Sequence, residues 1–232
     1  MNVIITGASK GIGKAIANRF ASCGYNLFLC GRNPDHLDET ASEILSAFPS
    51  VKIKLKSVDL SVKEQVQLFA DWCLHFGTPD ILVNNAGTYL PGNTIDEAEG
   101  TLESMMNINL YSAYHLTRKL LPAMMKNGSG HIFNICSIAS LHAYEGGGGY
   151  SISKFALHGF SQNLRHELKG TGIKVTAVYP GAVHTSSWGD FDNSSGRIME
   201  ADDVAAMVLA ASNLSPQATV EEIVMRPQAG DL

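Results

Sequence analysis

The chain has 232 residues, of which 45% are hydrophobic and 17% are charged, and its formal net charge is −5. This balance predicts one globular domain, residues 1–232, and lysine and arginine form no block of the kind that a nucleic-acid or anionic membrane surface needs. No apolar run is long enough to cross a bilayer, the start does not resemble a signal peptide, and the four cysteines form no CxxC pair. We therefore expect a cytoplasmic protein with reduced thiols.

Short apolar runs alternate with longer stretches of helical period along the whole chain. The expected strands are 3–6, 27–30, 53–58, 80–87, 131–137, 173–180 and 221–227. The expected helices are 12–21, 36–48, 61–76, 97–126, 150–169 and 201–212. This alternation predicts an α/β fold of Rossmann type, a doubly wound parallel sheet of about seven strands with helices on both faces. Segments 88–96 and 181–199 look irregular and follow strands, where ligand loops lie in such a sheet.

A glycine-rich turn, TGASKGIGKAIA (6–17), follows the first expected strand. Its glycines, Gly7, Gly11 and Gly13, have the spacing GxxxGxG. Glycines allow a tight turn and a close backbone approach, and the N-terminus of the next helix then faces a pyrophosphate. The turn predicts a nucleotide site, and a turn that serves packing alone is the alternative.

The end of the second expected strand indicates which dinucleotide is preferred. A site for NAD usually places a carboxylate there, against the ribose 2′-hydroxyl. Here the sequence reads LCGRNPD, with no acid before Asp35. Arg32, together with Lys10 in the glycine-rich turn, favours a 2′-phosphate and therefore NADP(H). The alternative is that both cations are solvated surface charges.

A run of four glycines, 146–149, leads directly into YSISK (150–154). Residues four apart share a helix face, so Lys154 is expected beneath the hydroxyl of Tyr150. A phenol ionises only near pH ~10, and a neighbouring ammonium stabilises the phenolate. The pair therefore predicts a general acid–base, and an ordinary tyrosine on an amphipathic helix is the alternative.

Several motifs occur in a fixed order along the chain: TGASKGIG (6–13), NNAG (84–87), Asn109 in NINL, Ser137, YSISK, and PGAVHT (180–185). Together they resemble the short-chain dehydrogenase/reductase family over essentially the whole chain. The resemblance implies four catalytic residues. Tyr150 would protonate the substrate oxygen, assisted by Lys154, which also holds the nicotinamide ribose. Ser137 would hydrogen-bond the substrate carbonyl, and Asn109 would hold a water of a proton relay.

The same resemblance implies a cofactor site for NADP(H) that is formed by residues spread along the chain. The expected contacts are Gly7, Ser9, Lys10, Gly11, Ile12, Gly13, Arg32, Asp59, Leu60, Asn85, Ala86, Gly87, Tyr150, Lys154, Pro180, Gly181, Val183 and Thr185. Asp59 would meet the adenine amino group. The eight histidines form no ligand cluster in the sequence, so we expect no metal.

The substrate segment is expected at 183–199, close to Ser137 and Tyr150. Trp188 would contact the substrate and, with Phe191, would offer a wall to a planar group, although Trp188 as a packing residue is the alternative. Other candidates on these loops are Asp190, Asp192, His142 and His184. The glycine run would widen the pocket mouth or let its loop close, unless it is only a tolerated connector.

The segments PGAVHTSSWG and VEEIVMRPQAGDL look like those of the bacterial sepiapterin-reductase-like branch. That branch implies NADPH-dependent reduction of a carbonyl on a pterin side chain or of a related vicinal dicarbonyl. The main alternative is a 3-oxoacyl-[acyl-carrier-protein] reductase, which the single arginine in 181–203 disfavours, since the carrier is acidic. Another sugar or alcohol dehydrogenase is a further alternative. A catalytically silent NADP(H)-binding regulator is the alternative from another class, but the four catalytic residues are present.

Helices 97–126 and 150–169 are expected to form the face of a homodimer or homotetramer. Their apolar residues exceed the number that one face of a sheet needs. These residues are Leu102, Met105, Met106, Ala113, Leu116, Leu120, Phe155, Leu157 and Phe160.

Overall fold

The computed structural model describes residues 1–231, in which seven parallel strands form one sheet with the order β3-β2-β1-β4-β5-β6-β9. The strands are β1 (Asn2–Thr6), β2 (Asn26–Gly31), β3 (Ile53–Ser57), β4 (Ile81–Asn84), β5 (Gly130–Ile135), β6 (Ile173–Pro180) and β9 (Glu222–Met225). Two further strands, β7 (Val183–His184) and β8 (Met199–Glu200), pair with each other beyond the main sheet. The predicted Rossmann-type class is confirmed.

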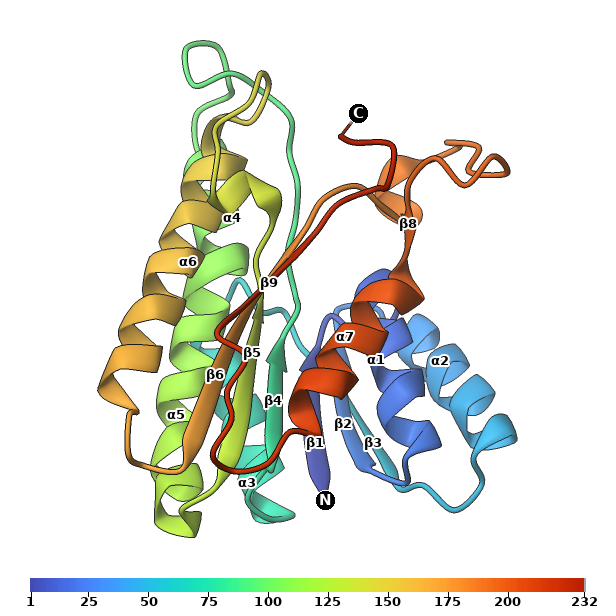
Figure 1. Ribbon diagram of the computed structural model, residues 1–232, viewed down its shortest axis with the longest axis vertical. Coiled ribbons are helices and arrows are strands. Elements are labelled where there is room, and N and C mark those ends of the chain that lie inside the picture. The colour runs from blue at the N-terminus through green and yellow to red at the C-terminus, as the bar shows by residue number, and fades with distance from the viewer. Residues whose placement is uncertain (232) are drawn as a thin grey trace.

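Helices cover both faces of this sheet (Figure 1). One face carries α1 (Gly11–Ser22), α2 (Pro34–Ala47) and α7 (Ala201–Ser212). The other carries α3 (Lys63–His75), α5 (Ser112–Asn127) and α6 (Gly148–Glu167), with the short α4 (Thr101–Met106) before α5. No helix within residues 1–231 combines the length and apolar character of a membrane span.

The central strands are mostly apolar because both of their faces are buried. On β1, Val3 and Ile5 pack toward α1, whereas Ile4 packs toward α3 and α5. Successive side chains of a strand point to opposite faces, so a strand between two helical layers needs no polar alternation. This burial fixes the register of the sheet and hence the positions of the loops at its carboxyl edge.

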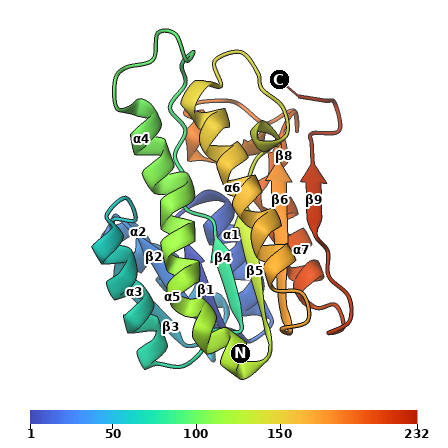
Figure 2. The same ribbon diagram turned by 90° about the vertical axis from the view of Figure 1, so that its left-hand side faces the viewer.

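The strand order reverses between β1 and β4, and this reversal opens a crevice at the carboxyl ends of the strands. In Figure 2 these ends point upward, and the loops that follow β4 and precede α6 rise above them. The N-terminus lies at the opposite edge and the C-terminal tail returns to the crevice edge (Figures 1 and 2). The irregular segments therefore gather at one edge, as the sequence predicts.

The boundaries of several expected elements were wrong. The fourth strand ends at Asn84 because Asn85 turns back to bond the first strand. The helix expected over 97–126 starts at Thr101, and a π-helical turn, Asn107–Tyr111, divides it. The helix expected from 150 begins at Gly148, so two of the four glycines are helical.

The apolar residues that were expected to face a second subunit are mostly part of the core. Ala113, Leu116, Leu120 and Leu157 are buried because α5 and α6 pack against the sheet and α3 packs against α5, and Met105 is buried because α4 packs against α6. The expectation is therefore wrong for these residues. The large apolar side chains that α5, α6 and the π-helical turn expose are Tyr111, Met125, Ile152 and Phe155.

A histidine lies in the interior of the sheet. His131 on β5 places Nε2 2.7 Å from Thr176 Oγ1 on β6, and Thr176 Oγ1 donates to the carbonyl of Val220. The threonine proton is thus engaged, so His131 Nε2 is the donor of the first bond. Burial lowers the pKa of His131 to about 3.

We expect this histidine to destabilise the protein in mild acid. In the unfolded chain His131 takes up a proton below about pH 6.5, whereas the folded state resists until about pH 3, so stability falls as the pH falls through that window. His131→Gln should therefore reduce the loss of unfolding free energy between pH 7 and pH 5 by about 2 kcal/mol, measured by urea unfolding. His166→Gln, at an exposed histidine, is the control. An unchanged pH dependence in His131→Gln would contradict the prediction.

Candidate active site

The glycine-rich turn between β1 and α1 is fixed by the side chain of Asn85. Asn85 Nδ2 donates to the carbonyls of Thr6 and Gly7, at 2.9 and 3.1 Å. The backbone amides of Asn85 and Ala86 donate to Thr6 Oγ1. A Cβ on Gly13 would lie 2.3 Å from the Gly7 carbonyl oxygen, so only glycine allows α1 to approach the turn this closely. The first turn of α1 is thereby held against the crevice.

Two cations flank this turn without a carboxylate partner among residues 1–231. Lys10 and Arg32 are exposed and form no ion pair there, whereas Lys14 pairs with Glu43 at 2.6 Å. Gly31, at the end of β2, lies against Ser9, where a Cβ would be 3.3 Å from the serine Oγ. No acid stands at this point, so the two cations are available to an anionic group.

Asp59 follows β3 on the same edge. Its Oδ1 accepts from the hydroxyl and the backbone amide of Ser61, at 2.7 and 2.9 Å. These two bonds, the hydroxyl first, and more weakly the charge of Arg32, lower the pKa of Asp59 below its ordinary value. Asp59 is thus a carboxylate with its other oxygen open to a donor. The adjacent Leu60 is buried in the core, so only its backbone can contact a ligand.

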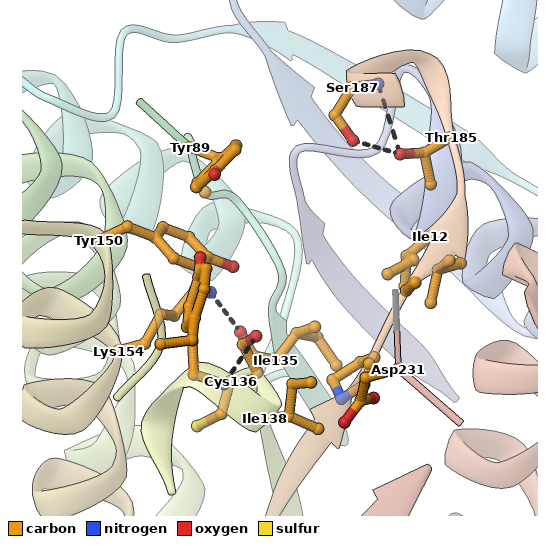
Figure 3. Close-up of a pocket in the computed structure, with 18 of the residues that line it drawn as sticks. Ile12, Tyr89, Ile135, Cys136, Ile138, Tyr150, Lys154, Thr185, Ser187 and Asp231 are labelled. Carbon is orange, nitrogen blue, oxygen red and sulfur yellow. Dashed lines mark hydrogen bonds between the residues drawn. The ribbon is translucent and has the colours of Figure 1, made fainter. Parts of the chain in front are cut away.

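A cavity of about 750 Å³ lies at the carboxyl ends of β1, β4, β5 and β6 (Figure 3). The expected cofactor residues that line it are Ile12, Asn85, Gly87, Tyr150, Lys154, Pro180, Gly181, Val183 and Thr185. The expected residues that lie outside its lining are Gly7, Ser9, Lys10, Gly11, Gly13, Arg32, Asp59, Leu60 and Ala86. In Figure 3 the two labelled tyrosines and Lys154 face Ile12 and Thr185 across the cavity.

Three of the four expected catalytic residues share one wall of this cavity. Lys154 is buried in α6, with 4% of its surface exposed, and its Nζ donates to the Ile135 carbonyl at 2.9 Å. The Nζ lies 5.8 Å from the centre of the Tyr150 ring. Ser137 lies two residues after β5 and accepts a bond from the amide of Ala139, which leaves its hydroxyl hydrogen available. The tyrosine, the lysine and the serine therefore line the same cavity.

Asn109, the fourth, lies behind this wall in the π-helical turn. Its Oδ1 accepts from the amide of Thr88 at 2.8 Å, and its Nδ2 donates to the Thr88 carbonyl and to Ser153 Oγ. The extra residue of a π turn turns the side chain out of the regular helical register. A Cβ on Gly87 would lie 3.3 Å from Asn109 Oδ1 and 3.5 Å from Lys154 Nζ. The glycine thus leaves a gap between the amide and the ammonium.

Two other acidic side chains of the cavity stay protonated. Burial raises the pKa of Cys136 to about 11, although the nearby charge of Lys154 lowers it. Burial, and then the neighbouring Tyr89 and Tyr150, raise the pKa of Tyr144. Neither group supplies a counter-charge to Lys154 at neutral pH.

The substrate segment contributes less than the sequence predicts. Trp188 lines the cavity and packs on Phe191 at 5.4 Å, but Phe191 does not line it. Asp190 is exposed outside the lining, and Asp192 accepts bonds from Ser194. Of the two histidines, His142 lines the cavity, whereas His184 lies 3.9 Å from Glu200 outside it.

Residues 146–149 lie outside the cavity lining, so the run does not widen the cavity. Gly147, Gly148 and Gly149 are tightly packed, whereas a Cβ on Gly146 would meet nothing within 4 Å. A Cβ on Gly147 would lie 2.6 Å from Ser151 Oγ, and one on Gly148 would lie 2.4 Å from the Gly92 carbonyl oxygen. The prediction that the run widens the pocket mouth is therefore wrong, and residues 147–149 are not a loose connector, whereas closure of the loop stays a prediction. The glycines allow the backbone of segment 88–97 to approach the start of α6.

The C-terminal tail supplies cavity residues that the sequence analysis missed. Arg226 and Asp231 form an ion pair in the lining. Arg197, in the loop before β8, donates to the carbonyls of Gly230 and Asp231 at 2.9 and 2.8 Å. The loop thus holds the tail over the cavity. Tyr89 and Tyr144, from the loops after β4 and before α6, were also missed.

Comparison with known proteins agrees with this architecture. Residues 1–195 match the family model described as short chain dehydrogenase. An uncharacterised oxidoreductase of Staphylococcus epidermidis is 32% identical over 225 residues, 97% of this chain and 96% of that protein. The chain therefore belongs to the short-chain dehydrogenase/reductase family of oxidoreductases.

Solved structures show the same fold with ligands. An alcohol dehydrogenase from the archaeon Thermococcus sibiricus, complexed with 5-hydroxy-NADP, has a TM-score of 0.91 and 28% identity over 98% of this chain and 96% of that one. The L-sorbose reductase from Gluconobacter frateurii, complexed with NADPH and L-sorbose, has a TM-score of 0.87 and 27% identity over 97% and 94%.

Proposed function

We propose that the protein is an NADP(H)-dependent carbonyl reductase. The observation that carries the proposal is the placement of Tyr150, Lys154 and Ser137 on one cavity wall, facing the turn at the start of α1. The free cations Lys10 and Arg32, the open Asp59 carboxylate and the turn locked by Asn85 fit the adenosine end of the cofactor. The NADP forms bound to the two solved relatives support this choice. When bound, NADPH supplies the hydride for the carbonyl carbon.

The chain's own residues would then manage the substrate oxygen. Ser137 donates its hydroxyl hydrogen to the carbonyl and orients it, because its oxygen already accepts from Ala139. Tyr150 donates the proton to the developing alkoxide, and the ammonium of Lys154 stabilises the phenolate that remains. Asn109 holds Thr88 and α6, which keeps the gap beside Gly87 in place for a relay water.

Aromatic side chains around this wall favour a planar or vicinal carbonyl substrate, such as sepiapterin or a vicinal diketone. Tyr89 packs against Tyr150, and Tyr144 and Trp188 also line the cavity. A 3-oxoacyl-[acyl-carrier-protein] reductase is the main alternative, but Arg197 is engaged with the tail and so is not free to bind an acidic carrier. The names of the two solved relatives keep an alcohol or sugar substrate as a further alternative, and a silent cofactor-binding regulator is the alternative without turnover.

A carbonyl panel tests the proposal directly. We expect NADPH oxidation with sepiapterin or a vicinal diketone to exceed that with an acetoacetyl thioester or L-sorbose. Tyr150→Phe should lower kcat by about 10²–10⁴-fold and change NADPH affinity by no more than a few-fold, since the phenol hydrogen acts only in the proton transfer. Tyr25→Phe, remote from the cavity, is the control. Full turnover in Tyr150→Phe would contradict the role of the phenol.

Cofactor choice has its own test. The double variant Lys10→Ala with Arg32→Ala should narrow the preference for NADPH over NADH by about tenfold or more, because it removes two charge-assisted contacts to a 2′-phosphate. The ratio of kcat/KM for the two cofactors measures this. Lys14→Ala is the control, since Lys14 pairs with Glu43. A ratio that is unchanged in the double variant would refute the charge argument.

We also propose that the protein is a homodimer or homotetramer that uses the outer face of α5 and α6. Phe155 and Ile152 are each 42% exposed on α6, beside a helix that exposes Tyr111 and Met125 at its ends. Phe155→Glu should weaken association about 100-fold or more, because it places an unpaired charge in the contact. Light scattering measures the mass, and Leu68→Glu, at an exposed leucine of α3, is the control. A monomeric wild type would overturn this proposal.

A further inference from the structure

The helix that carries Tyr150 and Lys154 begins without a cap of its own. Gly147 is the N-cap residue of α6 and has no side chain to accept a bond from the first amides. The first turn of a helix leaves backbone N–H groups without partners, and these are normally satisfied by a nearby side-chain oxygen. Tyr150 stands in that first turn, so fraying there would move the phenol.

The missing cap comes from a distant segment. Glu97 Oε2 accepts a bond from the Gly149 amide at 3.0 Å, across 52 residues of sequence. Glu97 is half-buried while its sequence neighbours Asp96 and Ala98 are exposed, and it forms no ion pair within residues 1–231. The carboxylate thus has the helix end as its partner, where the helix dipole also favours a negative charge.

The glycine run explains how this carboxylate gains access. A Cβ on Gly148 would lie 2.8 Å from Glu97 Oε2, and one on Gly149 would lie 3.2 Å from Oε1. Any side chain at these two positions would push the carboxylate away from the amide. The contact with Glu97 and its segment therefore requires glycine at 148 and 149, the two residues directly before Tyr150.

The segment that carries Glu97 is attached to the active site at several points, although it has no regular structure. Its beginning, Thr88, is fixed by the paired bonds to Asn109. Its middle is joined to the glycine run, since the Gly92 amide donates to the Gly146 carbonyl and the Gly146 amide donates to Asn93 Oδ1. The segment thus bridges the π-helical turn and the start of α6.

The same segment also contacts the catalytic ring. Tyr89 packs edge-on against Tyr150, with ring centres 4.9 Å apart, and Figure 3 shows the two rings adjacent in the cavity. Tyr89 of segment 88–97 therefore contacts the ring of Tyr150. Glu97 of the same segment contacts the backbone of Gly149, one residue before Tyr150. The ring and the backbone beside it are both restrained from one segment.

From these contacts we propose that Glu97 is a positioning residue, which caps α6 from segment 88–97 and thereby holds Tyr150 in place for proton transfer. This inference rests on the proposed function, because it assigns Tyr150 the proton transfer. Glu97 does not touch the substrate site, since it lies outside the cavity lining. Its effect passes through the first turn of α6.

Three variants test the proposal: Glu97→Ala removes the acceptor, Glu97→Gln keeps an acceptor oxygen without the charge, and Glu99→Ala is the control at an exposed acid two residues on. In Glu97→Ala, amide hydrogen exchange across 148–152 should quicken about tenfold, because the first turn loses its cap. kcat for carbonyl reduction should fall about tenfold, with NADPH affinity unchanged, because the phenol is misplaced. Glu97→Gln should recover both to within about threefold of wild type.

The outcomes separate the inference from the proposed function. Unchanged exchange in Glu97→Ala overturns the cap whether or not a substrate is known. Faster exchange with an unchanged kcat in Glu97→Ala overturns the positioning role and shows that Glu97 only supports the helix. If Glu97→Gln is as impaired as Glu97→Ala, the hydrogen bond is not the basis of the effect. If the wild-type protein reduces no carbonyl, and so is as inactive as Tyr150→Phe, the proposed function is refuted and the positioning role with it. The exchange result still decides whether Glu97 caps the helix.

Discussion

A buried ammonium without a carboxylate partner is the constraint around which the site is arranged. Lys154 donates to one backbone carbonyl, that of Ile135, and forms no ion pair within residues 1–231. A buried charge is costly unless polar groups surround it. Cys136 stays a neutral thiol beside it, so the positive charge is left uncompensated toward the cavity. A site with this field favours groups that become negative during a reaction, which is the requirement for reducing a carbonyl.

The two sides of the cavity are held in different ways. On the side of α1, the amide of Asn85 and the close packing at Gly13 tie the turn to the strands, within the sheet itself. On the other side, the loops after β4 and before α6 are held by several hydrogen bonds and one ring contact outside the sheet, and the C-terminal tail is held by Arg197 and by the ion pair of Arg226 with Asp231. The first side is tied directly to the buried strands, and the second depends on contacts between loops. Local opening, where it occurs, is cheapest on the second side.

The sequence predicts the features of the fold and the site that depend on residues close together in the chain. The buried strands follow from their apolar runs, the turn from its glycines, and the pairing of Tyr150 with Lys154 from helical spacing. The roles expected from family resemblance fall on residues that the fold brings to one edge. The cap from Glu97, the place of Tyr89 and the return of the tail depend on contacts across the fold, and no local pattern encodes them. The glycine run is evident in the sequence, but its packing against segment 88–97 could not be predicted, because that segment lies about fifty residues earlier in the chain.

The return of the tail has a practical meaning for anyone who produces the protein. Gly230 and Asp231 are fixed by Arg197 at the edge of the cavity, while Met1 lies at the amino edge of the sheet, far from it (Figure 1). A purification tag placed before Met1 leaves the cavity untouched. A tag attached after the tail begins next to Asp231, which lines the cavity. Comparisons of activity between preparations therefore have to be made with the same end of the chain left free.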